Sequence, residues 1–221
     1  MIYGIIDTAL IKGVGKKMNQ TDAIRKYITN SPETVIDVSY LHSRYFPLVD
    51  YRTFIKILKR LSIEGLIKQV DRGVYVLAEV SDENIEQAVF QYYMRDTNGM
   101  VIGDTLYSDL GISTRKPEMI RAYTNRLPNG KQKHVLSFEL IGADVIFDEP
   151  ARKLVTVLEL MEHREDIDNL DYIKYIEIVN ENITVYSDAL ADEITSAIHY
   201  REHIVMSFRK LKETFEYGST I

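Results

Sequence analysis

The stretch that decides the fold covers residues 50–77 and reads DYRTFIKILKRLSIEGLIKQVDRGVYVL. Asp50 is a favourable N-cap because its carboxylate can accept hydrogen bonds from the free backbone N–H groups of a first helical turn. Behind it, apolar residues recur at helical spacing and predict one buried stripe: Phe54, Ile57, Leu58 and Leu61. Gly65 follows where a glycine commonly ends a helix.

Two short runs rich in β-branched residues come next, at residues 66–70 and 74–77. Asp71, Arg72 and Gly73 join them, and the glycine supplies the positive φ that a tight hairpin needs. On the helix before this hairpin, the face opposite the apolar stripe carries four cations: Arg52, Lys56, Lys59 and Arg60. A helix with a basic outer face followed at once by a basic-tipped hairpin is the layout of a winged helix-turn-helix.

The residues upstream supply the remaining parts of such a domain. Asn19 or Thr21 can cap a helix that runs to about residue 29, and Ser31-Pro32 ends it. Residues 34–37 predict a small strand that pairs with the wing, and residues 38–45 predict a second short helix. We therefore expect a winged-helix DNA-binding domain at residues 19–79, preceded by an N-terminal arm or short helix at residues 1–18.

Residues 80–221 predict an acidic α/β domain, so the fold class expected for the whole chain is α+β. Strands are expected at residues 118–125, 133–140 and 144–147. Helices are expected at about 82–95 and 103–110, and the chain becomes helical from about residue 150, with helices at 151–162, 172–180, 188–197 and 200–217.

Charge is distributed unevenly between these two parts. Residues 1–80 hold 12 Lys and Arg against 8 Asp and Glu, whereas residues 81–221 hold 15 against 25, within a net charge of −6. This asymmetry indicates a basic module that meets phosphate and an acidic module with another role. The chain has no cysteine, and its apolar opening MIYGIIDTALI is too short to cross a bilayer and lacks signal-peptide features. We expect a cytoplasmic protein without a membrane anchor.

Two segments of the sequence resemble a known family. The first combines Leu58-Lys59-Arg60-Leu61, Gly65-Leu66-Ile67 and Arg72-Gly73-Val74-Tyr75. The second combines Gly103-Asp104-Thr105-Leu106-Tyr107 and Leu110-Gly111-Ile112-Ser113-Thr114 with Pro117, Ile120, Tyr123, Thr124 and Asn125. Together they are similar to the AbiEi-type antitoxins and transcriptional regulators of type IV, abortive-infection toxin–antitoxin systems, over roughly residues 19–160.

The resemblance implies a repressor of its own operon. In that family the N-terminal domain binds inverted repeats in promoter DNA. The C-terminal domain is needed to neutralise a toxin of nucleotidyltransferase type, often without a stable complex. The expected partners are therefore double-stranded DNA and, functionally if not physically, such a toxin, with no cofactor and no metal.

The residues expected to contact DNA lie on the helix that starts at Asp50 and on the hairpin. Arg52, Thr53 and Lys56, with Tyr51 beside them, are expected to face base edges near the N-terminal end of the helix. Lys59, Lys68 and Arg72 are expected to contact phosphates, and Arg60 either.

Two other function classes compete with this reading. The winged helix can instead serve an adaptor as a protein-docking surface. The second alternative is a zinc peptidase, because His199-Tyr200-Arg201-Glu202-His203 matches the H-x-x-E-H pattern. On a helix, His199 and His203 would share one face and could bind one zinc ion, with Glu202 as the base.

Overall fold

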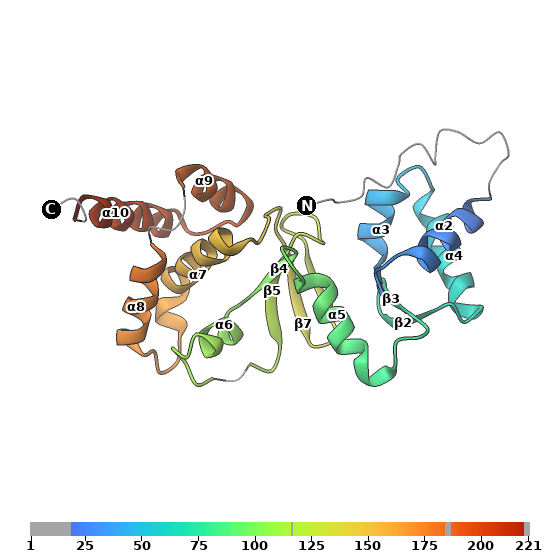
Figure 1. The fold of residues 1–221 in the computed structure, drawn as a ribbon, viewed down its shortest axis with the longest axis horizontal. Helices are drawn as coiled ribbons and strands as arrows, with labels where there is room; N and C mark the ends of the chain where they lie inside the picture. The colour runs from blue at the N-terminus through green and yellow to red at the C-terminus, as the bar shows by residue number, and fades with distance from the viewer. Residues whose placement is uncertain (1–18, 116, 184–186, 219–221) are drawn as a thin grey trace.

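The computed structural model describes residues 19–115, 117–183 and 187–218. It has mixed α+β architecture, with helices near its start and a helical C-terminal part, as the sequence predicts at that level. The expected N-terminal arm lies outside the described residues. Figure 1 shows an elongated molecule with two units side by side, and we call them the N-terminal and the C-terminal unit.

The described part of the N-terminal unit, from residue 19 on, contains three helices and a small antiparallel sheet. In chain order its elements are α2 (Gln20–Asn30), β1 (Val35–Asp37), α3 (Val38–Tyr45), α4 (Tyr51–Ile63), β2 (Ile67–Asp71) and β3 (Val74–Leu77). The sheet order is β1-β3-β2. The strand β1, which lies between α2 and α3 in the chain, therefore pairs with the hairpin, as predicted. Ile24, Phe54, Leu58 and Leu61 form its core and are fully buried.

The C-terminal unit begins with a 3-10 turn, η1 (Asp82–Asn84), and α5 (Ile85–Met94). Its sheet has the order β4-β5-β7-β6, in which β5 and β7 are parallel and the other two neighbouring pairs are antiparallel. The strands are β4 (Gly99–Ile102), β5 (Ile120–Thr124), β6 (Gln132–Val135) and β7 (Phe138–Gly142), and the short helix α6 (Asp104–Asp109) follows β4.

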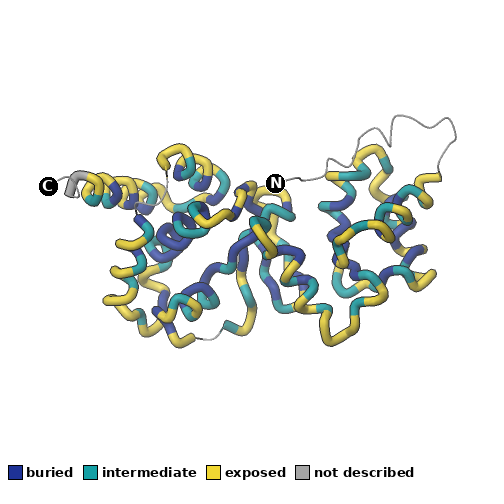
Figure 2. Tube along the Cα trace, viewed as in Figure 1, coloured by how far each residue is buried: buried dark blue, intermediate teal, exposed yellow. Residues whose placement is uncertain are grey.

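Helices complete this unit at the far end of the molecule. They are α7 (Glu149–His163), the 3-10 turn η2 (Arg164–Asp166), α8 (Tyr172–Asn182), α9 (Asp188–Ala197) and α10 (Glu202–Gly218). Ala151 and all residues from 154 to 160 of α7 are buried. Such an unbroken run is the pattern of a helix enclosed on all sides. Figure 2 shows α7 as a buried segment, whereas α8 and α10 are exposed along much of their length.

A third cluster of buried residues joins the two units. Val35, Val74 and Val76 project from one face of the β1-β3-β2 sheet and pack with residues of α5, β5, β6 and β7. The opposite face of the same sheet contributes Ile36, Ile67 and Tyr75 to the N-terminal core. The small sheet is therefore covered on both faces, which accounts for the uninterrupted apolar run Val74-Tyr75-Val76-Leu77.

Two sequence-based predictions for the C-terminal unit were wrong in detail, and one strand was missed. The run expected as one strand at 133–140 is two strands, because Leu136 adopts a φ of 52° and turns the chain between β6 and β7. Residues 144–147 form no strand, whereas β4, which was not predicted, pairs with β5. Among the described residues, no helix is long and apolar enough to cross a membrane.

Candidate nucleic-acid interface

Helix α4 is fixed at both ends by the residues that its sequence suggested. The Asp50 carboxylate accepts hydrogen bonds from Thr53 N at 2.9 Å and Thr53 Oγ1 at 3.0 Å, and these bonds hold the pKa of Asp50 below its usual value. At the other end, Gly65 has a φ of 77° and donates to Ser62 O, while Leu66 N donates to Leu61 O. This pair of bonds is a Schellman motif, which ends the helix at a defined residue.

The inner face of α4 is anchored in the N-terminal core. Phe54, Leu58 and Leu61 are fully buried, as the apolar stripe predicts. The Phe54 ring packs against Phe46, with centroids 5.6 Å apart, and against His42, with centroids 5.3 Å apart. Tight packing of one face leaves the helix little freedom to rotate about its axis. The outer face therefore presents a fixed set of side chains.

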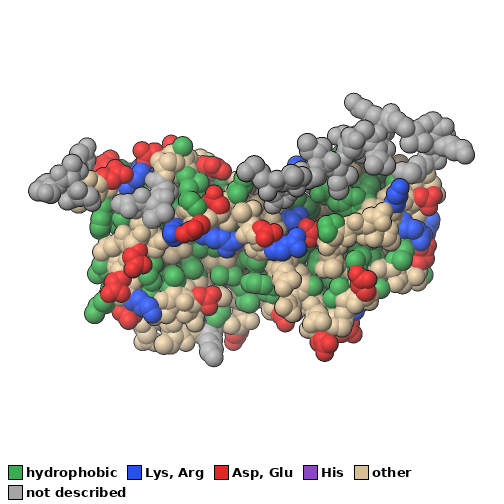
Figure 3. Space-filling view, viewed as in Figure 1, with side chains coloured by type: hydrophobic (Ala, Val, Ile, Leu, Met, Phe, Trp, Pro, Cys, Tyr) green, Lys and Arg blue, Asp and Glu red, His purple; other side chains and the backbone are tan. Residues whose placement is uncertain are grey.

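Four cations lie exposed on that outer face: Arg52, Lys56, Lys59 and Arg60. Within the part of the chain that the structure describes, none of them pairs with a carboxylate within 4.0 Å. Unpaired cations on one rigid face can meet a polyanion without first breaking internal ion pairs. Figure 3 shows Lys and Arg side chains at the end of the molecule that α2 and α4 form.

Tyr51 and Thr53 accompany these cations at the start of α4. Tyr51 is 43% exposed, and its ring meets His42 edge-on at 5.0 Å. Thr53 is half-buried, and its hydroxyl already donates to Asp50. Thr53 is therefore engaged in the helix cap, whereas Tyr51 leaves much of its ring open to a ligand.

The structure does not bring Lys68 to this face. Lys68 lies opposite Val76 in the β2–β3 register, so it projects from the sheet face that packs on the C-terminal unit. Its ammonium lies 2.6 Å from Asp82 Oδ1 and holds the pKa of that carboxylate below its usual value. Lys68 thus acts in an ion pair beside the junction, away from the cations of α4.

Arg72 is exposed at the tip of the hairpin, but the tip itself contacts the C-terminal unit. Asp71 Oδ2 accepts a hydrogen bond from Leu136 N at 2.9 Å, and Gly73 O lies 3.4 Å from Lys133 Nζ. The hairpin is therefore held at the β6–β7 turn and does not project freely into solvent.

A buried carboxylate, Asp37, links the two units. Asp37 is fully buried, and its Oδ2 lies 2.7 Å from the Tyr93 hydroxyl and 2.5 Å from Lys133 Nζ. Its Oδ1 caps α3 by accepting from Tyr40 N at 3.0 Å. Sequence reasoning treated Asp37 as the end of a strand and missed Lys133 altogether. One signal in the sequence was available. Asp37 is an acid inside an otherwise apolar segment, and a buried acid requires a partner.

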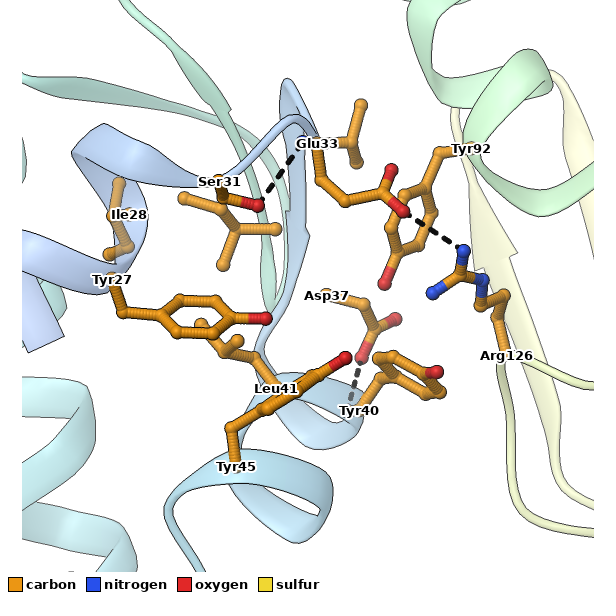
Figure 4. A pocket seen from close by; sticks show the side chains of 12 residues that line it. Tyr27, Ile28, Ser31, Glu33, Asp37, Tyr40, Leu41, Tyr45, Tyr92 and Arg126 are labelled. Atoms are coloured by element: carbon orange, nitrogen blue, oxygen red, sulfur yellow. Dashed lines mark hydrogen bonds and ion pairs between the residues drawn. The ribbon is translucent and has the colours of Figure 1, made fainter. Parts of the chain in front are cut away.

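Arg126 makes a second link across the junction. It donates to Glu33 Oε1 at 3.0 Å, and its guanidinium lies 4.9 Å from the ring centroids of both Tyr40 and Tyr92. Figure 4 shows these side chains around a small cavity, with the hydroxyls of Tyr27 and Tyr45 directed into it. The cavity measures about 40 Å³, enough for a few water molecules.

The peptidase motif does not form the arrangement that the alternative requires. Helix α10 begins at Glu202, and His199 lies in the non-helical linker before it. His199 and His203 therefore do not share one face of a helix, which is the geometry that the zinc peptidase alternative requires. Among the described residues, no group of three or more His, Cys, Asp or Glu side chains could hold a metal ion.

Comparisons with known proteins give no family for this chain. No family model matches the sequence. No curated protein matches it either. Among solved structures, the chain is similar to one described as the crystal structure of the RV2827C protein from Mycobacterium tuberculosis, with 13% identity and a TM-score of 0.36. The match covers 87% of this chain and 75% of that one, and a likeness this low carries no argument about fold or function.

Proposed function

We propose that the N-terminal unit is a winged helix-turn-helix domain that binds duplex DNA, with α4 entering the major groove. The order helix, strand, helix, helix, hairpin and the β1-β3-β2 sheet support this assignment. The observation that carries the proposal is the outer face of α4. Its four cations are exposed, lack carboxylate partners among the described residues, and are held in place by a capped and buried helix.

The biological role that we propose is transcriptional repression in the cytoplasm. The protein binds inverted repeats upstream of its own operon and serves as the antitoxin of a type IV toxin–antitoxin pair, whose toxin is of nucleotidyltransferase type. The AbiEi-like segments described above support this role. The division of charge between a basic first part and an acidic second part is consistent with it, because each part then meets a different partner.

The test is binding of the full chain to a labelled duplex from the region upstream of its own reading frame. We expect tighter binding to this duplex than to a shuffled sequence, and a loss of roughly 10³-fold or more between about 50 and 200 mM salt if six or more phosphates are contacted. The variant R52A/K56A should bind much more weakly. A matched control is R164A, which removes an exposed cation of the C-terminal unit.

Equal binding by R52A/K56A and R164A would contradict the assignment of α4 as the DNA-binding helix. The adaptor hypothesis predicts a different result in the same assay: no salt-dependent retention on duplex DNA by the wild-type chain. The two functions are therefore separated before any variant is made.

A further inference from the structure

Helix α8 packs on α7 with one face only. Val179 and Ile183, which follows its last turn, are buried, and Tyr175 and Ile178 pack partly against the same core. These residues recur at helical spacing and define the inward stripe. The outward stripe of such a helix ordinarily carries polar or charged residues.

The exposed surface along the first half of α8 is apolar, however. Tyr172 and Ile176 lie seven residues before Val179 and Ile183, so they extend the inward stripe toward the start of the helix, where it is exposed. Tyr172, Ile173 and Ile176 are 63%, 74% and 54% exposed, and they follow one another along the surface of the helix. Isoleucine is also a poorer helix former than leucine, lysine or glutamate, so neither solvation nor helix propensity favours it at these positions. Neighbouring exposed apolar side chains of this kind commonly mark a contact surface.

Two acidic residues of α8 lie beside these apolar side chains. Glu177 and Glu181 are exposed on α8, and within the described chain neither forms an ion pair. On the η2 turn before α8, Glu165 and Asp166 are also exposed, but they pair with Arg164 and His163. The one lysine of α8, Lys174, places its ammonium against Gly111. Where Figure 1 places α8, Figure 3 shows hydrophobic side chains with acidic and basic ones beside them.

We propose that the exposed apolar surface along the first half of α8 docks a second protein, which presents an apolar helix face flanked by Lys or Arg. A second copy of this chain fits poorly, because pairing α8 with itself would bring Glu177 and Glu181 of both copies together without a cation between them. In Figure 1, α8 and α4 lie at opposite ends of the molecule. A partner on α8 therefore leaves α4 accessible, and this proposal does not depend on DNA binding.

The first test uses a model peptide as the probe. A labelled amphipathic peptide of leucine and lysine, about 18 residues or five turns long, should bind the full chain at about 0.15 M salt. The variant I173S/I176S should bind it about tenfold more weakly. M206S is the matched control, because Met206 is 65% exposed on α10 and its loss should leave binding unchanged. Equal affinities for I173S/I176S and M206S would overturn the proposal, and so would failure of the wild-type chain to bind.

The second test separates charge from apolar contact and identifies the occupant. E177Q/E181Q should weaken peptide binding and flatten its salt dependence. Unchanged binding would show that these carboxylates do not contact the peptide, and would overturn the proposal of a partner flanked by Lys or Arg. All variants should melt at the wild-type temperature, because the substituted side chains are exposed. Sedimentation should show a monomer. A dimer that dissociates in I173S/I176S would make a second copy the occupant and overturn the proposal.

Discussion

The ammonium of Lys133 lies 2.5 Å from the buried carboxylate of Asp37, across the junction between the two units. Only 13% of the Lys133 side chain is exposed, and Asp37 is not exposed at all. The pair therefore sits in a medium that screens charge weakly. Removing one member leaves an uncompensated buried charge, which is far more damaging than losing an exposed ion pair.

We predict that K133M destabilises the protein by about 3–5 kcal/mol, because it keeps an apolar side chain of similar length but leaves Asp37 without its counter-charge. The measurement is urea denaturation followed by circular dichroism. The double variant D37N/K133M should recover part of the loss, since asparagine still caps α3 and carries no charge. K131M, at an exposed neighbouring position, should stay within about 0.5 kcal/mol of wild type. A K133M effect no larger than that of K131M would contradict the assignment.

The N-cap of α4 gives a prediction about pH. Hydrogen bonds from the backbone and hydroxyl of Thr53 lower the pKa of Asp50 in the folded state. A lowered folded-state pKa means that the stabilisation is present above the unfolded pKa, near 3.8, and is lost as the pH falls through the folded value. D50A should therefore melt below wild type at pH 7, with a difference that shrinks in strong acid.

D50N is the informative control for that experiment. Asparagine is also a good N-cap, so D50N should melt close to wild type at neutral pH. It carries no titrating group, so it should lose less stability than wild type below pH 4. Parallel pH profiles for D50N and wild type would show that Asp50 does not contribute through its charge.

The parts of the fold that depend on local sequence were predictable. Asp50, the stripe from Phe54 to Leu61 and Gly65 specify the start, the buried face and the end of α4 within 16 residues. The positions of α2, β1 and α3 follow equally from capping residues and turns. These features were confirmed because each is determined by contacts within a few residues of the chain.

What the sequence did not reveal depends on contacts between distant residues. Leu136 turns the chain with a positive φ, and its N–H is held by Asp71, 65 residues earlier. Likewise, no local pattern connects Lys133 with Asp37, which lies 96 residues earlier. The placement of Lys68 away from α4 follows only from the docking of the small sheet on the C-terminal unit. Tertiary packing decides these positions, and periodicity carries no information about it.

A second carboxylate gives a pH dependence of opposite sign. Glu159 on α7 is 1% exposed, and its carboxylate lies 3.0 Å from the Tyr123 hydroxyl. Burial raises its pKa, although His163, Tyr123, Tyr200 and Arg121 oppose the rise. An acid with a raised folded-state pKa stabilises the fold below its unfolded pKa, and this contribution is lost as the pH rises through the folded value.

We therefore predict that E159Q flattens the decline in stability above the unfolded pKa of about 4.5. The amide keeps the size of the side chain and a donor–acceptor pair, but it cannot ionise. Urea denaturation at several pH values between about 4 and 8 measures the effect. A decline in E159Q as steep as that of wild type would show that another group is responsible.

Arg52 should determine sequence preference in DNA binding. It lies exposed in the first turn of α4, where side chains of a recognition helix reach base edges. R52A should weaken binding to the preferred duplex by about 1–3 kcal/mol and leave non-specific binding much less affected. Competition between the upstream duplex and a shuffled one measures both effects. A proportional loss on both sequences would reassign Arg52 to phosphate contact.

Lys59 and Lys68 were both expected to contact phosphates, but the structure places them differently. Lys59 is exposed on the outer face of α4, whereas Lys68 pairs with Asp82 on the sheet face that packs on the C-terminal unit. K59A should lower the slope of log affinity against log salt by about one unit, because one fewer counterion is released. K68A should leave the slope unchanged, since its ammonium is already neutralised within the protein. Equal reductions in both variants would mean that bound DNA extends past α4 to β2, and that Lys68 exchanges Asp82 for a phosphate on binding.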